Sequence, residues 1–382
     1  MRPQNNPTRE KKNTTKEKKM IYHILIDRFD GGWKTPPQNV NGFLGGTIKG
    51  ITQRLDYIQS QGATAVWLSP FLKTESYHGY HITDYEAVEP RFGTWEDLRA
   101  LIAEAHSRGM KVISDFVPNH CYETHPFFQE ALANPESPYR KWFFFKGKRN
   151  EYKSFLSYTI LPKFNLTYKP AAEYMYGIAE NLIKNGIDGL RVDHALGVPM
   201  PFLKELRTRV HKLNPQATVV GEIWQYNVPR KLYSTLYFRN AFRRLYYTIF
   251  GMDQESVQLS YKGVLDGVLD FEFRNIMLEE IESGRGVEGN SRLEKKLRRH
   301  FARYSKCGLT PVLFLDNHDT DRILFRCGQD KKLLEQALQV MKNCGEPYII
   351  YYGTEKFMAN ESTIENAEPY ADLRVREAMA WE

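Results

Sequence analysis

The stretch Gly189-Leu-Arg-Val-Asp-His194 ends a short apolar run in charged side chains. Three other segments share this pattern: Asp115-Phe-Val-Pro-Asn-His120, Gly221-Glu-Ile-Trp224 and Phe314-Leu-Asp-Asn-His-Asp319. All four place Asp, Glu, Arg or His where a buried strand is expected to end. Barrels of alternating strands and helices hold their chemistry at these carboxyl ends of the strands. The segments therefore predict a barrel with a polar site at one mouth.

Short β-branched or aromatic runs alternate with amphipathic segments along the chain, which is typical of successive strand–helix units. We expect eight strands, at residues 21–26, 64–68, 111–116, 189–192, 218–222, 267–271, 312–315 and 348–352. Helices are expected at residues 47–59, 95–108, 171–184, 202–213 and 333–343. This order predicts an α/β fold, a (β/α)8 TIM barrel.

Composition narrows the class of protein. With 382 residues, 42% of them hydrophobic, the chain can bury a large core. Much of its net charge of +7 lies in residues 1–19, where the run 9–19 has no apolar side chain. We expect a disordered basic tail there, in preference to a nucleic-acid-binding arm.

The cysteines and the hydropathy pattern point to a soluble, cytoplasmic protein with no nucleic-acid or membrane partner. Cys121, Cys307, Cys327 and Cys344 are too few and too scattered for a disulfide framework or a metal site. No run approaches 18 apolar residues, and the N-terminus lacks the apolar core of a signal peptide. The oligomeric state stays open.

In order and spacing, the four segments resemble those of the α-amylase family, glycoside hydrolase family 13, over about residues 21–352. The resemblance implies that Asp193 is the nucleophile of a retaining mechanism and that Glu222 is its general acid and base. It also implies that Asp319 is a third carboxylate, which binds and distorts the reacting sugar. Neighbouring strands lie about 4.8 Å apart, so Asp193 and Glu222 can approach the roughly 5–5.5 Å separation of a retaining pair.

Further site residues follow from these segments and from His78-Gly-Tyr80, upstream of them. Arg191 lies two residues before Asp193, on the same face of the strand, where a guanidinium would keep that carboxylate ionised. The resemblance implies that two histidines bind sugar hydroxyls, that a tyrosine stacks on the sugar, and that an arginine lies near Asp319. The predicted substrate-binding residues are Tyr80, His120, Arg191, His318 and Arg322. Trp224 either flanks the product side of the site or only packs against neighbouring side chains.

The connection at residues 121–166 is far longer than an ordinary strand–helix loop and resembles the family's small domain B. The expected domains are therefore the tail at 1–19, barrel parts at 20–120 and 167–382, and domain B at 121–166. We expect the aromatic run Trp142-Phe-Phe-Phe145 to form the core of this insert; a sugar-stacking platform is the alternative.

The chain departs from the family pattern at two places. Many α-amylases carry Lys-His three and four residues beyond the nucleophile, where this chain has Leu196 and Gly197. Leu161-Pro-Lys-Phe-Asn165 is instead similar to a segment of neopullulanases and cyclomaltodextrinases. The family's calcium site uses a residue equivalent to Asn119 together with Asp residues from domain B, and no Asp occurs between Phe116 and Ile187. Because calcium prefers several carboxylate or carbonyl oxygens, we expect no metal and no cofactor.

These features predict a retaining hydrolase of α-1,4-linked malto-oligosaccharides or starch-like α-glucans. The alternatives are an α-glucan transglycosidase with the same triad and a non-catalytic, amylase-like binding protein. A phosphate-binding barrel is disfavoured, because residues 315–319 carry two carboxylates where it needs a glycine-rich loop.

The resemblance also sets an expectation for the end of the sequence. After the predicted strand at 348–352, the family continues into a final barrel helix and a separate β-sandwich, and only thirty residues follow Tyr352 here. We expect that helix and the β-sandwich to be absent. An apolar flank of the first and last strands would then be exposed and would promote association.

Overall fold

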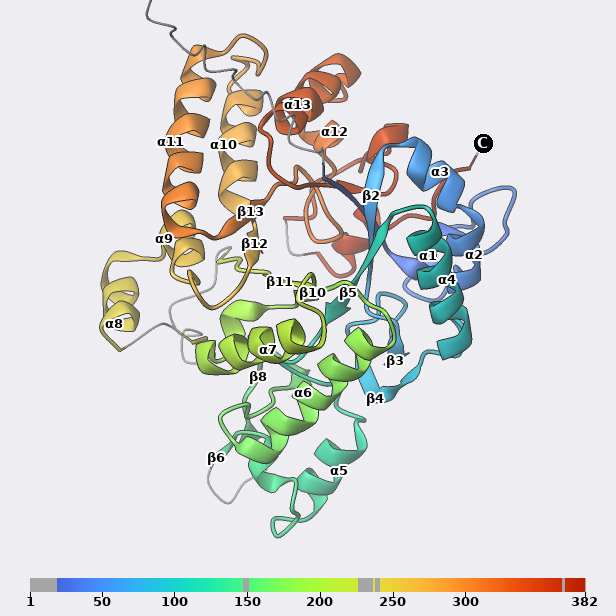
Figure 1. Cartoon of the computed structure of the whole chain (residues 1–382), viewed down its shortest axis with the longest axis vertical. Helices are drawn as coiled ribbons and strands as arrows, with labels where there is room; N and C mark the ends of the chain where they lie inside the picture. The colour runs from blue at the N-terminus through green and yellow to red at the C-terminus, as the bar shows by residue number, and fades with distance from the viewer. Residues whose placement is uncertain (1–18, 147–150, 226–235, 238–240, 366–367, 382) are drawn as a thin grey trace, which may run out of the picture.

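The computed structural model describes residues 19–146, 151–225, 236–237, 241–365 and 368–381 (Figure 1). Its main sheet has eight parallel strands: β1 (Met20–Ile24), β2 (Ala63–Leu68), β5 (Lys111–Phe116), β10 (Gly189–Val192), β11 (Thr218–Gly221), β12 (Gly267–Leu269), β13 (Thr310–Val312) and β14 (Tyr348–Tyr351). In space they follow the order β13-β12-β11-β10-β5-β2-β1-β14. Leu313 pairs with Tyr348 and so joins the two ends of the sheet. The predicted TIM barrel is therefore confirmed.

All eight predicted strands are present; those at 111–116 and 189–192 have the predicted bounds, and the other six are shifted at one or both ends. The largest shift is at β13, which was predicted at 312–315 and spans Thr310–Val312. Beyond Val312, Leu313 forms an isolated bridge with Tyr348. The basic tail predicted at residues 1–19 lies outside the described residues except for Lys19. The Lys19 carbonyl accepts a hydrogen bond from the Tyr348 amide at 3.1 Å.

Helices cover the outside of the barrel (Figure 1). Those between successive barrel strands are α1 (Ile26–Phe29), α2 (Ile48–Gln53), α3 (Leu55–Ser60), α4 (Trp95–Ser107), α6 (Lys169–Lys184), α7 (Met200–Leu213), α8 (Ala241–Phe250), α9 (Gln254–Leu259), α10 (Phe271–Glu282), α11 (Ser291–Cys307), α12 (Ile323–Arg326) and α13 (Lys331–Asn343). The single helix predicted at residues 47–59 is two helices, because the chain leaves helical geometry at Arg54 (φ −103°, ψ 6°).

Helix α4 illustrates why these segments are helical. Thr94 and Asp97 form a capping box at its start, which satisfies two amides that have no partner within the helix. Leu98, Leu101 and Ile102 then recur at helical spacing and are buried against the barrel. Apart from the helix predicted at 47–59, the four predicted helices, α4 among them, are present with boundaries that differ by one or two residues.

The barrel interior is filled by side chains and is not a pore. A compact cluster inside it contains residues from several strands or strand ends: Trp67, Leu269, Phe271, Val312, Phe314 and Ile349. Each is at most 3% exposed. Packing of this kind fixes the strand ends relative to one another, as the site at the barrel mouth requires.

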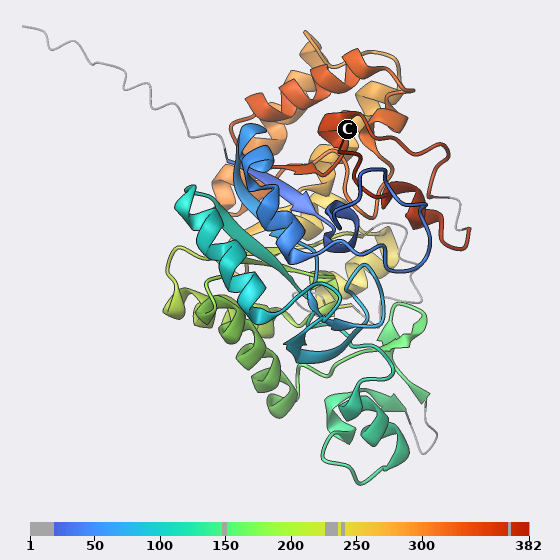
Figure 2. The ribbon, with the colours of Figure 1, turned by 90° about the vertical axis from the view of Figure 1, so that its right-hand side faces the viewer.

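The segment between β5 and α6 projects at one end of the molecule in both views (Figures 1 and 2). It contains α5 (Pro126–Ala133), the 3-10 helix η1 (Arg140–Trp142) and two short antiparallel ladders. These pair β6 (Phe145–Lys146) with β7 (Glu151–Tyr152), and β8 (Ser154–Phe155) with β9 (Tyr158–Pro162). Phe143 of the aromatic run is buried against Phe128 and Phe164, as expected for an internal core.

After β2, the antiparallel pair β3 (Leu72–Thr74) and β4 (Ile82–Val88) carries residues 75–81 toward the barrel mouth. After β14, the chain forms the 3-10 helices η4 (Thr354–Lys356) and η5 (Ala371–Val375). Residues 376–381 then pack on α1, where the Met379 amide donates to Arg28 O (2.8 Å). No helix within the described ranges is long and apolar enough to span a membrane.

The expected exposed flank along the first and last strands is not present in the described part of the chain. Tyr22, Ile24, Ile350 and Tyr351 are all buried. Exposed large apolar side chains gather instead on α8, where Phe242, Leu245, Tyr246, Ile249 and Phe250 are 45–73% exposed. The prediction for that flank was therefore wrong.

Candidate active site

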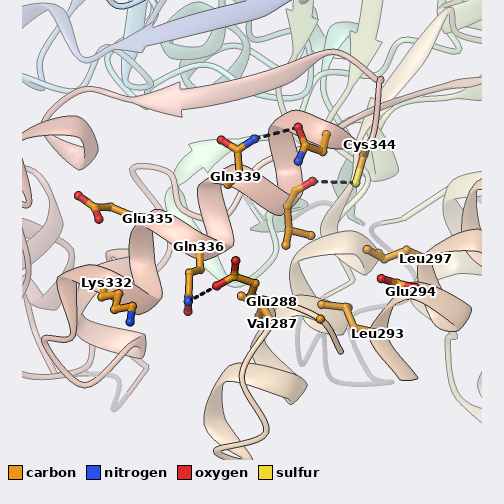
Figure 3. A pocket seen from close by; sticks show the side chains of 13 residues that line it. Val287, Glu288, Leu293, Glu294, Leu297, Lys332, Glu335, Gln336, Gln339 and Cys344 are labelled. Atoms are coloured by element: carbon orange, nitrogen blue, oxygen red, sulfur yellow. Dashed lines mark hydrogen bonds between the residues drawn. The ribbon is translucent and has the colours of Figure 1, made fainter. Parts of the chain in front are cut away.

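A surface pocket lies outside the barrel, between α11 and α13 (Figure 3). Apolar Leu293 and Leu297 line it together with Glu288 and Gln336, which are hydrogen-bonded at 2.5 Å. None of the predicted site residues lines this pocket. They lie instead at and beyond the carboxyl ends of the barrel strands.

One guanidinium brings the strand-end carboxylates together. Arg191 on β10 pairs with Asp115 on β5 in the parallel register, and its Nη1 lies 2.6 Å from Asp115 Oδ1. The same Nη1 lies 3.0 Å from Asp193 Oδ1, and Nη2 lies 2.6 Å from Glu222 Oε1. All four side chains are buried. Two of the three predicted catalytic residues therefore share one buried cation.

The turn after Asp193 also holds Glu222. His194 has left-handed backbone geometry (φ 40°, ψ 47°), which an ordinary residue adopts only at a cost. This turn lets the His194 amide donate to Glu222 Oε2 at 2.8 Å. Both oxygens of Glu222 are thus fixed, one by an amide and one by Arg191.

Burial favours the neutral form of both carboxyls. Desolvation raises the pKa of Asp193 well above its ordinary value, and the Arg191 guanidinium opposes this shift. Desolvation likewise raises the pKa of Glu222, again against Arg191. Because the two carboxyls also repel each other's charge, the pair retains a proton at a higher pH than isolated carboxyls would.

Asp319 has the opposite electrostatic environment. Its Oδ2 lies 3.0 Å from His318 Nε2, and its Oδ1 accepts a hydrogen bond from Arg376 Nη2 at 2.8 Å. Burial alone would raise the pKa of Asp319, but His318 and Arg376 hold it well below its ordinary value. Asp319 therefore stays ionised.

Tyr80 lies beside this third carboxylate. Its hydroxyl donates to Asp115 Oδ2 at 2.8 Å and lies 2.8 Å from His318 Nε2. The rings of Tyr80 and His318 are nearly parallel, with centroids 5.3 Å apart. The predicted stacking residue and one predicted histidine thus belong to the same cluster as Asp115 and Asp319.

His120 lies on the side of the site that faces the inserted segment. Its ring centroid is 5.0 Å from that of Phe155, which in turn lies 4.6 Å from the ring of His194. Burial lowers the pKa of His120 to about 3, so the ring is neutral. A neutral imidazole offers one donor and one acceptor nitrogen, as binding to a hydroxyl requires.

Two other residues contact aromatic side chains. Arg322 donates from Nη1 to Tyr352 O at 2.6 Å and lies over the Tyr351 ring, 4.2 Å from its centroid. The structure therefore does not bring Arg322 to Asp319. Trp224 stacks on Phe271 with a centroid distance of 4.9 Å, which is the packing alternative left open by the sequence.

Sequence reasoning missed two charged residues of the cluster. Asp115 begins one of the four segments, but its pairing with Arg191 depends on the strand register. Arg376 lies 57 residues after Asp319 and reaches it through the chain that follows β14. The only signal for Arg376 was that residues 374–381 resemble a segment of the family.

Several known proteins resemble this chain over most of its length. The family model "Alpha amylase, catalytic domain" matches residues 12–382. Alpha-amylase 2 of Dictyoglomus thermophilum is 36% identical over 347 residues, covering 89% of this chain and 55% of that protein. Neopullulanase 2 of Thermoactinomyces vulgaris is 31% identical over 385 residues, covering 95% and 59%.

Among solved structures, a cyclomaltodextrinase superposes with a TM-score of 0.76 at 26% identity, covering 95% of this chain and 59% of that one. The chain spans 55–60% of the length of the curated relatives it matches. The matching family model extends over nearly all of the barrel and its strand-end carboxylates. This protein therefore belongs to the α-amylase family, and residues 12–382 correspond to that family's catalytic domain.

Proposed function

We propose that this chain is a retaining glycoside hydrolase that cleaves α-1,4-glucosidic bonds in malto-oligosaccharides or starch-like α-glucans by double displacement. The observation that carries the proposal is the shared contact of Arg191 with Asp193 and Glu222. Retaining enzymes need two carboxyl groups close enough to act on opposite sides of one glycosidic bond. Family membership supports the α-glucan class of substrate.

In the first half of the reaction, Glu222 donates its proton to the glycosidic oxygen while Asp193 attacks the anomeric carbon. The bond to the leaving sugar breaks, and a covalent glycosyl–Asp193 ester forms. Glu222 can act as the acid because burial raises its pKa. Arg191 holds the attacking oxygen in place at 3.0 Å.

In the second half, Glu222 is a carboxylate and takes a proton from water. The water oxygen attacks the anomeric carbon, the ester bond to Asp193 breaks, and the sugar leaves with its original configuration. Asp319 remains ionised throughout and accepts hydrogen bonds from hydroxyls of the reacting sugar. Tyr80 offers the apolar C–H face of that sugar an aromatic surface.

The names of two similar proteins indicate pullulan and cyclic maltodextrins as candidate substrates within this class. One is a neopullulanase and the other a cyclomaltodextrinase. The Leu161–Asn165 segment of this chain resembles the corresponding segment of such enzymes. A cytoplasmic location is part of the proposal, because all four cysteines are free thiols, as a reducing compartment would keep them.

Product analysis and two variants test this proposal. The protein is incubated separately with starch, pullulan, cyclodextrin and maltotriose, and the products are separated by chromatography. We expect glucose and maltose from maltotriose, and NMR should show the α-anomer first. Growth of maltotriose into longer oligomers would instead establish the transglycosidase alternative.

The variants Asp193→Asn and Glu222→Gln should each lose at least about a thousandfold in kcat, since each removes a group that acts in the transition state. Circular dichroism checks that both remain folded. Near-normal turnover in either variant, or initial release of the β-anomer, would refute the assigned roles.

A further inference from the structure

Lys163 is a buried lysine whose ammonium lies between two parts of the barrel mouth. It directly follows β9 in the inserted segment and is 2% exposed. Its Nζ donates to the side-chain oxygen of Asn119 and to the main-chain carbonyl of Gly197. No carboxylate among the described residues lies within ion-pair distance of this ammonium. Its charge is therefore stabilised by neutral oxygens and by the Tyr237 ring, whose centroid lies 5.5 Å from Nζ.

The two accepting oxygens belong to the segments that carry the site. Asn119 follows β5, and Gly197 ends the turn that begins at Asp193. This turn approaches Asn119 so closely that a Cβ on Gly197 would lie 2.6 Å from Asn119 Oδ1. The backbone of Phe164 also donates to Asn119 O at 3.0 Å, which fixes the lysine beside them.

The α-amylase resemblance places a calcium ion here, with Asn119 as one ligand. The residues of this chain do not fit that ion. Calcium takes six to eight oxygen ligands, several of them carboxylates, but the part of the chain that the structure describes contains no group of three Asp, Glu, His or Cys that could hold a metal. Moreover, the ammonium of Lys163 already occupies the space beside Asn119 Oδ1.

We propose that Lys163 is a built-in cation that takes the place of the calcium ion and ties the inserted segment to the turn after Asp193. An ammonium has the charge and the donors to hold two oxygens together, although it binds fewer oxygens than calcium does. The chain thereby gains a junction that needs no metal. Without the ammonium, the Asn119 and Gly197 oxygens would be buried and unsatisfied, which destabilises the junction.

Burial works against this lysine and lowers its pKa to about 7. A buried charge persists only where polar partners replace its lost hydration. The Asn119 and Gly197 oxygens supply such partners. Measurements at a pH below that value keep the ammonium protonated and so test its role as a cation.

Thermal unfolding of the full chain, with EDTA or with millimolar calcium, tests the proposal. The wild-type Tm should be the same in both conditions. Lys163→Met keeps most of the stem but removes the charge, so its Tm should fall by several degrees and stay low in calcium. Lys169→Met, at an exposed lysine nearby, is the matched control and should melt like the wild type.

Lys163→Asp turns the junction into a metal site. Its shorter side chain leaves room for an ion, because Ca–O distances of about 2.3–2.6 Å replace the missing methylene groups. Its Tm should be low in EDTA and rise by several degrees in calcium. A wild-type Tm that depends on calcium, or a Lys163→Met protein that melts like the wild type, would overturn the proposal. The wild-type comparison stands even if a variant fails to fold.

Discussion

At the scale of single residues, the chemistry of the site depends on the protonation states of Asp193 and Glu222. Both carboxyls are buried against Arg191, and the pKa of Glu222 is raised. The general acid must be protonated when the substrate binds. Activity is therefore kept while Glu222 is protonated and is lost as the pH rises through its raised pKa.

This predicts an alkaline limb of kcat/KM at a pH above the ordinary glutamate value of about 4.3. The measurement is a pH profile of kcat/KM with maltotriose at constant ionic strength. The profile is measured on the wild type, because the Asp193→Asn protein would turn over too slowly to give one. An alkaline limb at the ordinary glutamate value would contradict the assignment of Glu222.

A second prediction concerns Arg376, which positions Asp319. Its Nη2 donates to Asp319 Oδ1 and its Nε donates to His318 O, both at 2.8 Å. Arg376→Ala removes a cation that keeps Asp319 ionised. We expect kcat/KM to fall by about tenfold to a hundredfold, mostly through kcat, because Asp319 is no longer held in place against the reacting sugar.

Arg376→Lys should restore part of the activity, since it keeps the charge but cannot donate to both Asp319 and His318 O in the same way. Arg374→Ala is the control, because that arginine lies two residues earlier and contacts Glu368 and Thr363 O instead. A purely structural role for Arg376 would lower the free energy of unfolding and leave kcat of the folded protein unchanged.

The sequence allowed the carboxylates to be predicted but not all of their partners. Asp193, Glu222 and Arg191 follow from strand periodicity and the family resemblance, because short strands fix where their last residues point. Strand periodicity and the resemblance could not show that Arg376, and not Arg322, contacts Asp319. Each is placed by a loop, and loop conformation depends on distant contacts such as Tyr352 O for Arg322.

At the scale of elements, the barrel strands were predictable and several helices were not. The strands are short apolar runs between turns, a pattern that few other structures produce. Helix α11, by contrast, buries Leu293, Leu297, His300 and Tyr304 on one face. Only two of these four residues are aliphatic and many of the others in the helix are charged, so the segment has little of the apolar content expected of a barrel helix.

His300 of α11 joins three helices and supplies a third prediction. Its Nε2 lies 2.7 Å from Asp270, which caps α10, and its Nδ1 lies 3.0 Å from Glu255 on α9. Burial disfavours the charged ring, but these two carboxylates raise the pKa of His300 overall. Its stabilising contribution is therefore fully present below the ordinary histidine value of about 6.5 and is lost as the pH rises through the folded-state pKa.

His300→Gln should thus lower the free energy of unfolding more at about pH 5.5 than at about pH 9. Urea titrations of both proteins at the two pH values measure this difference. Comparing the variant with the wild type at each pH cancels the titration of all other groups. An equal loss at both pH values would show that His300 is neutral in the folded protein.

At the scale of the whole molecule, residues far apart in the sequence meet where the chain after β14 returns to the first helices. The indole N–H of Trp381 donates to Phe29 O at 2.9 Å, and its ring packs edge-on against Phe29 and Tyr57. Arg54 lies over the same ring, 4.0 Å from its centroid. This contact covers the β1 side of the barrel.

The last prediction is that Trp381→Ala lowers the free energy of unfolding by about 2–4 kcal/mol, somewhat less than a fully buried tryptophan would. Trp381→Phe keeps the ring packing and loses one hydrogen bond, so it should cost only about 1 kcal/mol. Because Arg376 lies on the same segment, Trp381→Ala should also reduce kcat/KM under conditions where the protein is folded. Urea titration and maltotriose kinetics measure the two effects. If Trp381→Ala unfolds like the wild type, the Trp381 contacts do not stabilise the barrel, and the position of Arg376 must then depend on its own contacts with Asp319, His318 and Asp372.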